Sequence, residues 1–292
     1  MIYNNQKNIF FFWDGGKMSF MRYLTLYSFR LFHPEWNIIL IKDNTEYKND
    51  LWKHVEKQDL LSYNGEDYFQ KSLELDIKIV NFNEKYTQIF KEIEIDIDLI
   101  SPVHKKDILN WYLLSENCGI VADMDILFVR NLNKEYKLFI ESKAQTGLIC
   151  FDNLPLAKYI PVSLMMGNRS TFSFSIFKKS LKKYDPNIYE SCGSILLDDN
   201  LSDLINSPSE VEYFKLQDEI IFPFTTKISY TEAVYNQYFG DLKHLIDIKK
   251  TAGIHWYAGN PHSQLFNNQI NHKNYHNFNG TLAKLIKEIY NA

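Results

Sequence analysis

The stretch KKDILNWYLLSENCGIVADMDILFV, residues 105–129, carries the main structural signal of this chain. Residues 104–117 predict a helix, because their apolar side chains recur with helical spacing. Cys118-Gly119 ends the helix, and a buried strand follows at once. Asp123 and Asp125 lie one residue apart in this otherwise apolar run. Two like charges in a buried segment require a physical explanation.

A buried pair of carboxylates is costly unless positive charge lies beside it. A divalent cation such as Mg²⁺ or Mn²⁺ is a common solution, since these ions prefer oxygen ligands. In an extended strand, residues i and i+2 point the same way, so Asp123 and Asp125 should point together. Ligands of open α/β sheets bind outside the carboxyl ends of strands. The pair therefore predicts a metal or phosphate site at the end of the strand GIVA.

A second D-x-D, in Ile95-Asp96-Ile97-Asp98, serves as an internal comparison. Here the acids continue a longer alternation of acidic and apolar residues, which begins at Glu92. This alternation is typical of a half-exposed edge strand or a surface turn. We therefore predict a structural role for this copy and a functional role for Asp123 and Asp125.

Outward from this stretch, strands and helices alternate. Residues 8–13 predict a strand, Ser19 caps a helix that extends to about residue 32, and residues 37–41 predict the next strand. This strand–helix–strand unit indicates an α/β domain. Later elements are predicted as strands at 146–151 and 220–224, and as helices at 170–184 and 280–290. We predict a single domain over 1–292, with a helical insertion at about 45–105 and peripheral helices at 45–78.

Composition limits the class of protein. The formal net charge of -4 argues against nucleic acid as a partner, because phosphate affinity comes largely from Lys and Arg. The three cysteines, Cys118, Cys150 and Cys192, form no C-x-x-C and indicate a reducing compartment. The N-terminal residues lack the pattern of a signal peptide. We therefore expect a cytoplasmic protein, and peripheral association with the inner face of the membrane stays open.

The helix and strand at 105–129 resemble the D-x-D glycosyltransferases of the family 32 type. This group includes mannosyltransferases and bacterial capsule and lipopolysaccharide transferases, with the clostridial glucosylating toxins as distant members. Residues 8–16 with 30–44 resemble the family's opening strands, and AGIHWYAGN at 252–260 resembles its C-terminal block. The positions that match the central motif are Asp107, Leu114, Gly119, Asp123 and Asp125.

The resemblance implies a GT-A fold, a mainly parallel and Rossmann-like α/β domain. It implies transfer of a sugar from a nucleotide-sugar, with a UDP-sugar favoured over a GDP-sugar, to a hydroxyl of a glycan or glycolipid acceptor. It also implies retention of configuration and a role in bacterial surface polysaccharide synthesis. The implied metal is Mn²⁺ or Mg²⁺. Its implied ligands are Asp123, Asp125 and His255, with Asp125 in direct contact and Asp123 at the ribose and a metal-bound water.

The remaining expected contacts lie around the donor. Phe12 and Trp13 are expected to flank the base by stacking, with plain core packing as the alternative. For His255, a satisfied core position is the alternative to a ligand role. The residues expected at the nucleotide, diphosphate or sugar are Asp107, Asn110, Asn260 and Ser263.

Departures from the family pattern keep two other functions open. The family's Arg is Asn110 here, its first glycine is Cys118, and its Tyr before the D-x-D is absent. One alternative is a metal-dependent nucleotidyl or phosphoryl transferase, which also uses paired carboxylates. No G-x-x-x-x-G-K-[ST] loop supports it. The other alternative is a non-catalytic carbohydrate-binding protein on the same fold.

Overall fold

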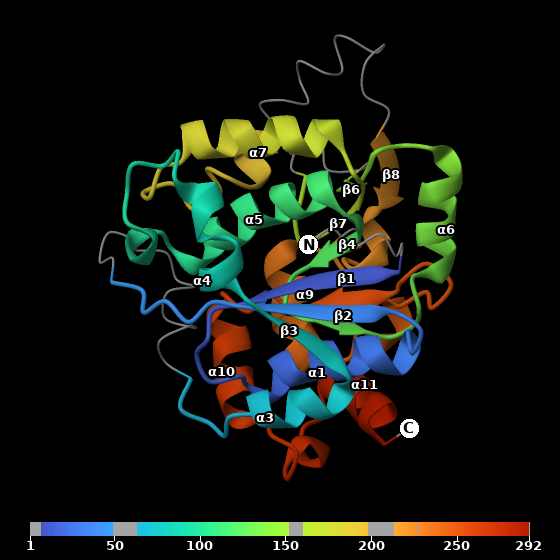
Figure 1. Ribbon diagram of the computed structural model, residues 1–292. Coiled ribbons are helices and arrows are strands. Elements are labelled where there is room, and N and C mark those ends of the chain that lie inside the picture. Colours follow the sequence, from blue (N-terminus) through green and yellow to red (C-terminus); the bar gives the residue numbers. More distant parts are fainter. Residues whose placement is uncertain (1–6, 49–62, 152–159, 198–212, 226, 292) are drawn as a thin grey trace.

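A seven-stranded sheet forms the centre of the protein (Figure 1). The computed structural model describes residues 7–48, 63–151, 160–197, 213–225 and 227–291. The strand order is β3-β2-β1-β4-β7-β6-β8, and β7 runs antiparallel to both of its neighbours, whereas the other pairs are parallel. The strands are β1 (Asn8–Trp13), β2 (Asn37–Lys42), β3 (Ile77–Asn81), β4 (Cys118–Ala122), β6 (Thr146–Cys150), β7 (Leu164–Asn168) and β8 (Tyr213–Gln217).

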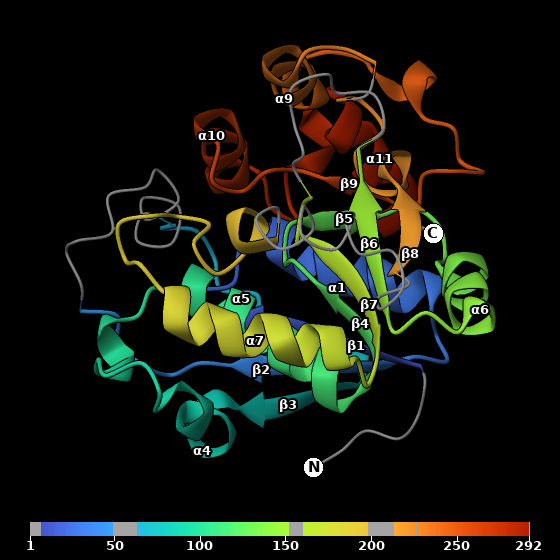
Figure 2. The same ribbon diagram turned by 90° about the horizontal axis from the view of Figure 1, so that it is seen from above.

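Helices cover both faces of this sheet (Figures 1 and 2). On one face lie α5 (Pro102–Glu116) and α7 (Thr171–Lys183), and on the other lie α1 (Phe20–Phe32) and α11 (Thr281–Tyr290). Further α-helices with described bounds are α3 (Phe69–Ser72), α4 (Phe82–Lys85), α6 (Asn133–Ser142), α9 (Tyr230–Phe239) and α10 (Pro261–Gln269). Short 3-10 helices are η1 (Leu73–Leu75), η2 (Thr87–Phe90), η3 (Ile97–Leu99), η4 (Asp218–Ile220), η5 (Lys243–Leu245) and η6 (Tyr275–Asn277).

Burial on both faces explains the continuous apolar run of β1. Phe11 packs into the core on the α1 side, whereas Phe10 and Phe12 pack into the core on the α5 side. A central strand covered on both faces needs apolar residues at every position rather than at alternate ones. This parallel order β3-β2-β1-β4 confirms the predicted mainly parallel, Rossmann-like α/β class.

Local signals set the starts of the two helices that flank the site. The Ser19 side chain accepts a hydrogen bond from the Arg22 N–H and caps α1. The Ser101 side chain accepts from the His104 N–H and caps α5, and Pro102 occupies the first turn, where no N–H is needed. The predicted bounds of these two helices agree with the structure to within about two residues.

The stretch 119–129 does not form one strand. After β4 the chain turns at Met124 and Asp125, and a second strand, β5 (Ile126–Phe128), pairs antiparallel with β9 (Gly253–His255) in a separate two-stranded sheet. The close approach of β4 to β1 depends on Gly119, whose φ is 147°. A Cβ at this position would lie 2.5 Å from the carbonyl oxygen of Asn8.

Two predicted segments differ from the structure. The strand predicted at 220–224 is wrong, because this segment is the end of η4 followed by a turn around Pro223. Ile221, Phe222 and Phe224 are buried through packing rather than through strand pairing, so the apolar run misled the prediction. Within the segment predicted as a helical insertion, 77–81 forms β3 of the main sheet, and 49–62 lies outside the described residues.

The buried face of the last helix agrees with the sequence prediction. Leu282, Leu285, Ile286 and Ile289 lie on the buried face of α11, as predicted. Among the helices of the described residues, none has the length and apolar character needed to cross a bilayer.

Candidate active site

Asp123 and Asp125 lie at the carboxyl end of β4, where the chain leaves the main sheet. The Asp123 N–H donates to the carbonyl of Ser163 at 2.8 Å, so the first acid is fixed by its backbone. The carboxylates converge because the chain turns between them and not because a strand pleat aligns them. The prediction of a buried pair is confirmed in part: Asp125 is 7% exposed, whereas Asp123 is half-buried.

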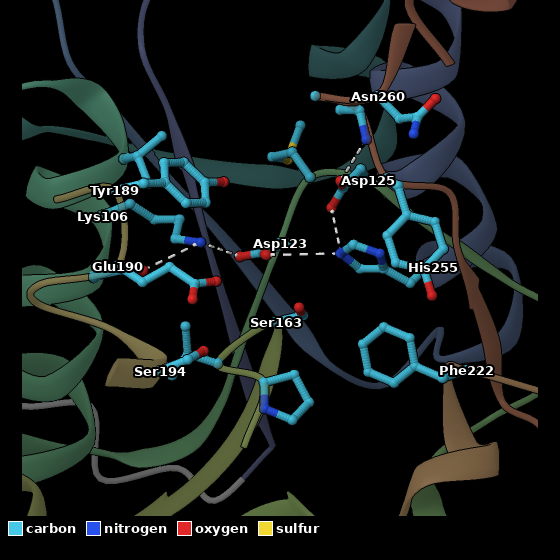
Figure 3. Close-up of a pocket in the computed structure, with 18 of the residues that line it drawn as sticks. Lys106, Asp123, Asp125, Ser163, Tyr189, Glu190, Ser194, Phe222, His255 and Asn260 are labelled. Carbon is cyan, nitrogen blue, oxygen red and sulfur yellow. Dashed lines mark hydrogen bonds and ion pairs between the residues drawn. The ribbon is translucent and has the colours of Figure 1, made fainter. Parts of the chain in front are cut away.

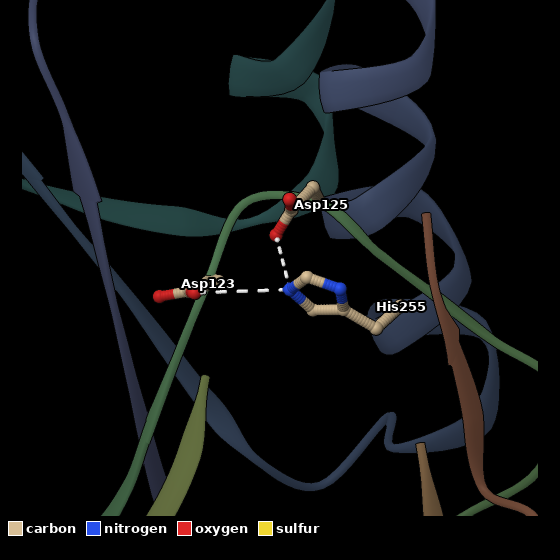
Figure 4. A group of neighbouring side chains, drawn as sticks. All are labelled: Asp123, Asp125 and His255. Carbon is tan, nitrogen blue, oxygen red and sulfur yellow. Dashed lines mark ion pairs between the residues drawn. The ribbon is translucent and has the colours of Figure 1, made fainter. Parts of the chain in front are cut away.

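His255 reaches the same point from β9, far along the chain (Figure 4). Its position is set by the register of the small sheet, in which Ile126 pairs with His255. The Nε2 atom lies 3.3 Å from Asp125 Oδ1 and 3.9 Å from Asp123 Oδ2. One ligand atom from each of the three residues lies within 4.8 Å of the others.

The charges of this cluster support each other. Burial alone would raise the pKa of Asp125, but the neighbouring His255 and Arg22 and the bond from the Ala258 N–H hold it below its ordinary value. Burial would lower the pKa of His255, but Asp125 and Asp123 raise it to about 9. The carboxylate and the imidazole therefore favour each other's charged forms.

The turn after β9 holds the second oxygen of Asp125. The Ala258 N–H donates to Asp125 Oδ2 at 2.9 Å, and the Trp256 N–H donates to the Asp125 carbonyl at 2.8 Å. This geometry requires Tyr257 to adopt a φ of 51°, which is unusual for a residue with a side chain. Strain of this kind costs about 1–3 kcal/mol and is concentrated at functional sites.

A divalent cation fits this donor set. Two carboxylate oxygens and one imidazole nitrogen suit Mn²⁺, and ligands on one small ion lie roughly 3–4 Å apart, close to the spacing found here. Asp125 Oδ1 and His255 Nε2 would be the inner pair, and Asp123 Oδ2 would complete the set.

The cluster opens onto a cavity of about 730 Å³ (Figure 3). Phe12, Trp13, Asp107 and Asn260, all predicted at the donor, line it. Phe12 and Trp13 are only 9% and 6% exposed, so they form its wall while packing mainly in the core. Burial raises the pKa of Asp107 in spite of the nearby Lys106.

Two predicted donor contacts lie elsewhere. The described residues that line the cavity do not include Asn110 and Ser263. Asn110 is 3% exposed within α5. The Ser263 hydroxyl donates to the Trp256 carbonyl at 2.9 Å and accepts from the Tyr238 hydroxyl at 2.7 Å, which ties α10 to the turn after β9.

Sequence reasoning missed several residues of the cavity, among them Arg22, Lys106, Tyr189, Glu190 and Tyr257. Lys106 directly precedes the motif residue Asp107, and this position in the chain was the available signal that Lys106 lies near the site. Two lysines stand there, however, and the sequence does not say which one faces the cavity. Tyr189 and Glu190 come from a segment between α7 and β8 to which no function was predicted.

Comparisons with known proteins give structural matches only. No family model matches the chain, and no curated protein matches it by sequence. The solved PaToxG glycosyltransferase matches with 15% identity over 70% of this chain and 71% of that chain, at a TM-score of 0.47. The galactosyltransferase LgtC, in complex with donor and acceptor sugar analogues, matches with 13% identity over 74% and 75%, at 0.39.

A third match is the apo form of the glycosyltransferase GlyE of Streptococcus pneumoniae, with 13% identity over 98% of this chain and 60% of that chain, at a TM-score of 0.46. Because identities are this low and TM-scores lie below 0.5, the function of this chain has to be argued from its own site.

Proposed function

We propose that this protein is a metal-dependent glycosyltransferase that moves a sugar from a nucleotide-sugar, preferably a UDP-sugar, to a hydroxyl of a glycan or glycolipid acceptor. The observation that carries the proposal is the convergence of Asp123, Asp125 and His255 on one point of a large cavity at the end of β4. Two carboxylates and an imidazole at the edge of a Rossmann-like sheet suit a cation that meets a diphosphate.

The chemistry of sugar transfer explains why these residue types meet here. The leaving group is a nucleoside diphosphate, whose negative charge grows as the sugar departs. A bound Mn²⁺ or Mg²⁺ would neutralise that charge. Asp125 remains ionised, and its orientation is fixed by the Ala258 N–H, so it needs no rearrangement to act as a ligand.

Other cavity residues have proposed contacts with the donor. Asp107 and Asn260 face the cavity: Asp107 would accept hydrogen bonds from the nucleotide, and Asn260 would bind the diphosphate or the sugar. Phe12 and Trp13 would form the wall beside the base. The Trp13 indole N–H already donates to the Gly16 carbonyl at 3.0 Å, which holds the ring in place. We assign Asn110 and Ser263, which do not line the cavity, to support of α5 and α10.

The finer assignments rest on the sequence resemblance. We place the chain with the family 32 type of D-x-D transferases, as one domain over 1–292 that retains configuration at the anomeric carbon. The proposed role is synthesis of a bacterial surface polysaccharide, such as capsule or lipopolysaccharide, by a cytoplasmic protein, with association at the inner face of the membrane left open.

The test is incubation of the purified protein with a panel of UDP- and GDP-sugars, with Mn²⁺ and with a chelator. We expect release of free nucleoside diphosphate from one donor, lost with the chelator and restored by added Mn²⁺. Release of pyrophosphate would instead indicate a nucleotidyl transferase. Donor or glycan binding without turnover of any donor would indicate a carbohydrate-binding protein.

A further inference from the structure

Lys106 lies in the cavity wall, and Figure 3 shows its ammonium between Asp123 and Glu190. Its Nζ atom donates to Asp123 Oδ1 at 2.7 Å and lies 3.3 Å from Asp107 Oδ1. The preceding Lys105 points away and pairs with Asp43 at 2.8 Å, with both side chains almost fully buried. The two lysines therefore differ in role: Lys105 holds α5 against the fold, whereas Lys106 faces the candidate metal site.

The two oxygens of Asp123 face different cations. Oδ1 accepts from Lys106, and Oδ2 faces His255 and would serve the metal. An ammonium and a divalent cation on one carboxylate repel each other strongly in a cavity of low dielectric constant. Lys106 is thus an internal competitor for the metal as long as it stays at Asp123.

Asp107 offers the ammonium a second position. Its side chain is 3% exposed, and its Oδ1 atom forms an ion pair with Lys106 Nζ at 3.3 Å but accepts no well-aligned hydrogen bond. A buried carboxylate oxygen without a donor is costly, so a hydrogen bond from Lys106 would be favourable there. A small rotation of the lysine side chain is enough to exchange one acceptor for the other.

We propose that Lys106 is a positioning residue with two states: it pairs with Asp123 in the metal-free protein and turns to Asp107 when a divalent cation takes Asp123. This inference rests on the proposed metal site. In the second state the ammonium stays in the cavity wall, beside Asp107 instead of Asp123. Metal binding therefore determines the position of this positive charge relative to the bound donor. Metal occupancy and donor binding are thereby coupled through one side chain.

Direct titration of the purified protein with Mn²⁺, without donor, tests the inference. In Lys106→Met the competitor is gone, and we expect the Kd for Mn²⁺ to fall about fivefold or more. In Asp107→Asn the ammonium loses its second carboxylate and stays at Asp123, so the Kd should rise by a similar factor. In the double variant, Asp107→Asn should have no effect, because there is no ammonium left to hold.

The control Lys137→Met removes the same charge from an exposed residue of α6, and the Kd should not change. Equal effects of Asp107→Asn in both backgrounds would mean a merely structural role and would overturn the inference. An unchanged Kd for Mn²⁺ in Lys106→Met would also overturn the inference. If in the same titrations the wild type binds Mn²⁺ and Asp125→Asn does not, the proposed metal site is still supported. A wild type that binds no Mn²⁺ would overturn both proposals.

Discussion

The chain spells D-x-D twice, at 96–98 and at 123–125, and the two copies have opposite surroundings. Asp96 is exposed. Asp98 lies within the surface turn η3 and forms an ion pair with Lys48 at 2.9 Å. Asp123 and Asp125 instead follow a buried strand and meet His255 beside a cavity. Of the two alternatives predicted for the first copy, an edge strand or a surface turn, the structure shows the turn.

The difference teaches that spacing alone carries little information about a carboxylate pair. Water solvates the acids at 96–98, so these carboxylates need no charged partner beyond one exposed lysine. At 123–125 water is largely excluded, and the acids are stabilised by a lysine, a histidine and a backbone N–H. The cost of burial is what forces the second copy to gather partners, and those partners make it a candidate site.

The largest expected effect is on turnover, from Asp125→Asn. Removal of this charge takes away a ligand that is oriented for the metal, so we expect the rate of donor cleavage with Mn²⁺ to fall about 100- to 1,000-fold. The circular dichroism spectrum should not change, because the amide oxygen can still accept from the Ala258 N–H. Equal losses from Asp98→Asn would show that the two copies had been assigned the wrong way round.

Gly119→Ala tests why only one copy ends a buried strand. A methyl group would lie 2.5 Å from the Asn8 carbonyl, at a φ of 147° that favours glycine. We expect the free energy of unfolding to fall by about 1–3 kcal/mol, measured in urea. Gly16→Ala is the matched control, since its Cβ would meet nothing closer than 3.5 Å, and its stability should hold. Equal stability of both variants would contradict this account of β4.

His255→Ala removes the histidine that lies beside Asp123 and Asp125. We expect the Kd for Mn²⁺ to rise about tenfold or more, because one of three protein ligands is lost. His262→Ala is the control, as this histidine packs against Tyr235 and Phe239 away from the cluster. An unchanged Kd and an unchanged Mn²⁺ dependence of the rate would return His255 to a core role.

The smallest effect is expected from the double change Asp96→Asn and Asp98→Asn. Its rate with Mn²⁺ should stay within about twofold of wild type, because an exposed pair with Lys48 contributes little and lies outside the cavity. A larger loss, in a protein that is still folded, would mean that this surface turn contacts the donor or the acceptor.

Local signals in the sequence determined much of the fold. The Ser19 cap, the apolar runs of β1 and β2 and the amphipathic α11 could all be predicted, because each depends on residues close in the chain. The D-x-D at the end of β4 could be predicted for the same reason: a run of apolar residues implies burial, and burial of charge implies a partner.

Only the tertiary structure decided which partners meet. His255 arrives through the pairing of β9 with β5, and the choice of Lys106 over Lys105 depends on how α5 rotates against the sheet. The run at 220–224 was buried without forming a strand, because long-range packing overrode its apolar pattern. The local sequence thus indicates that a charge is buried. The groups that neutralise this charge come from elements far away in the chain. Only tertiary packing determines the register of those elements and which of their side chains point toward the charge.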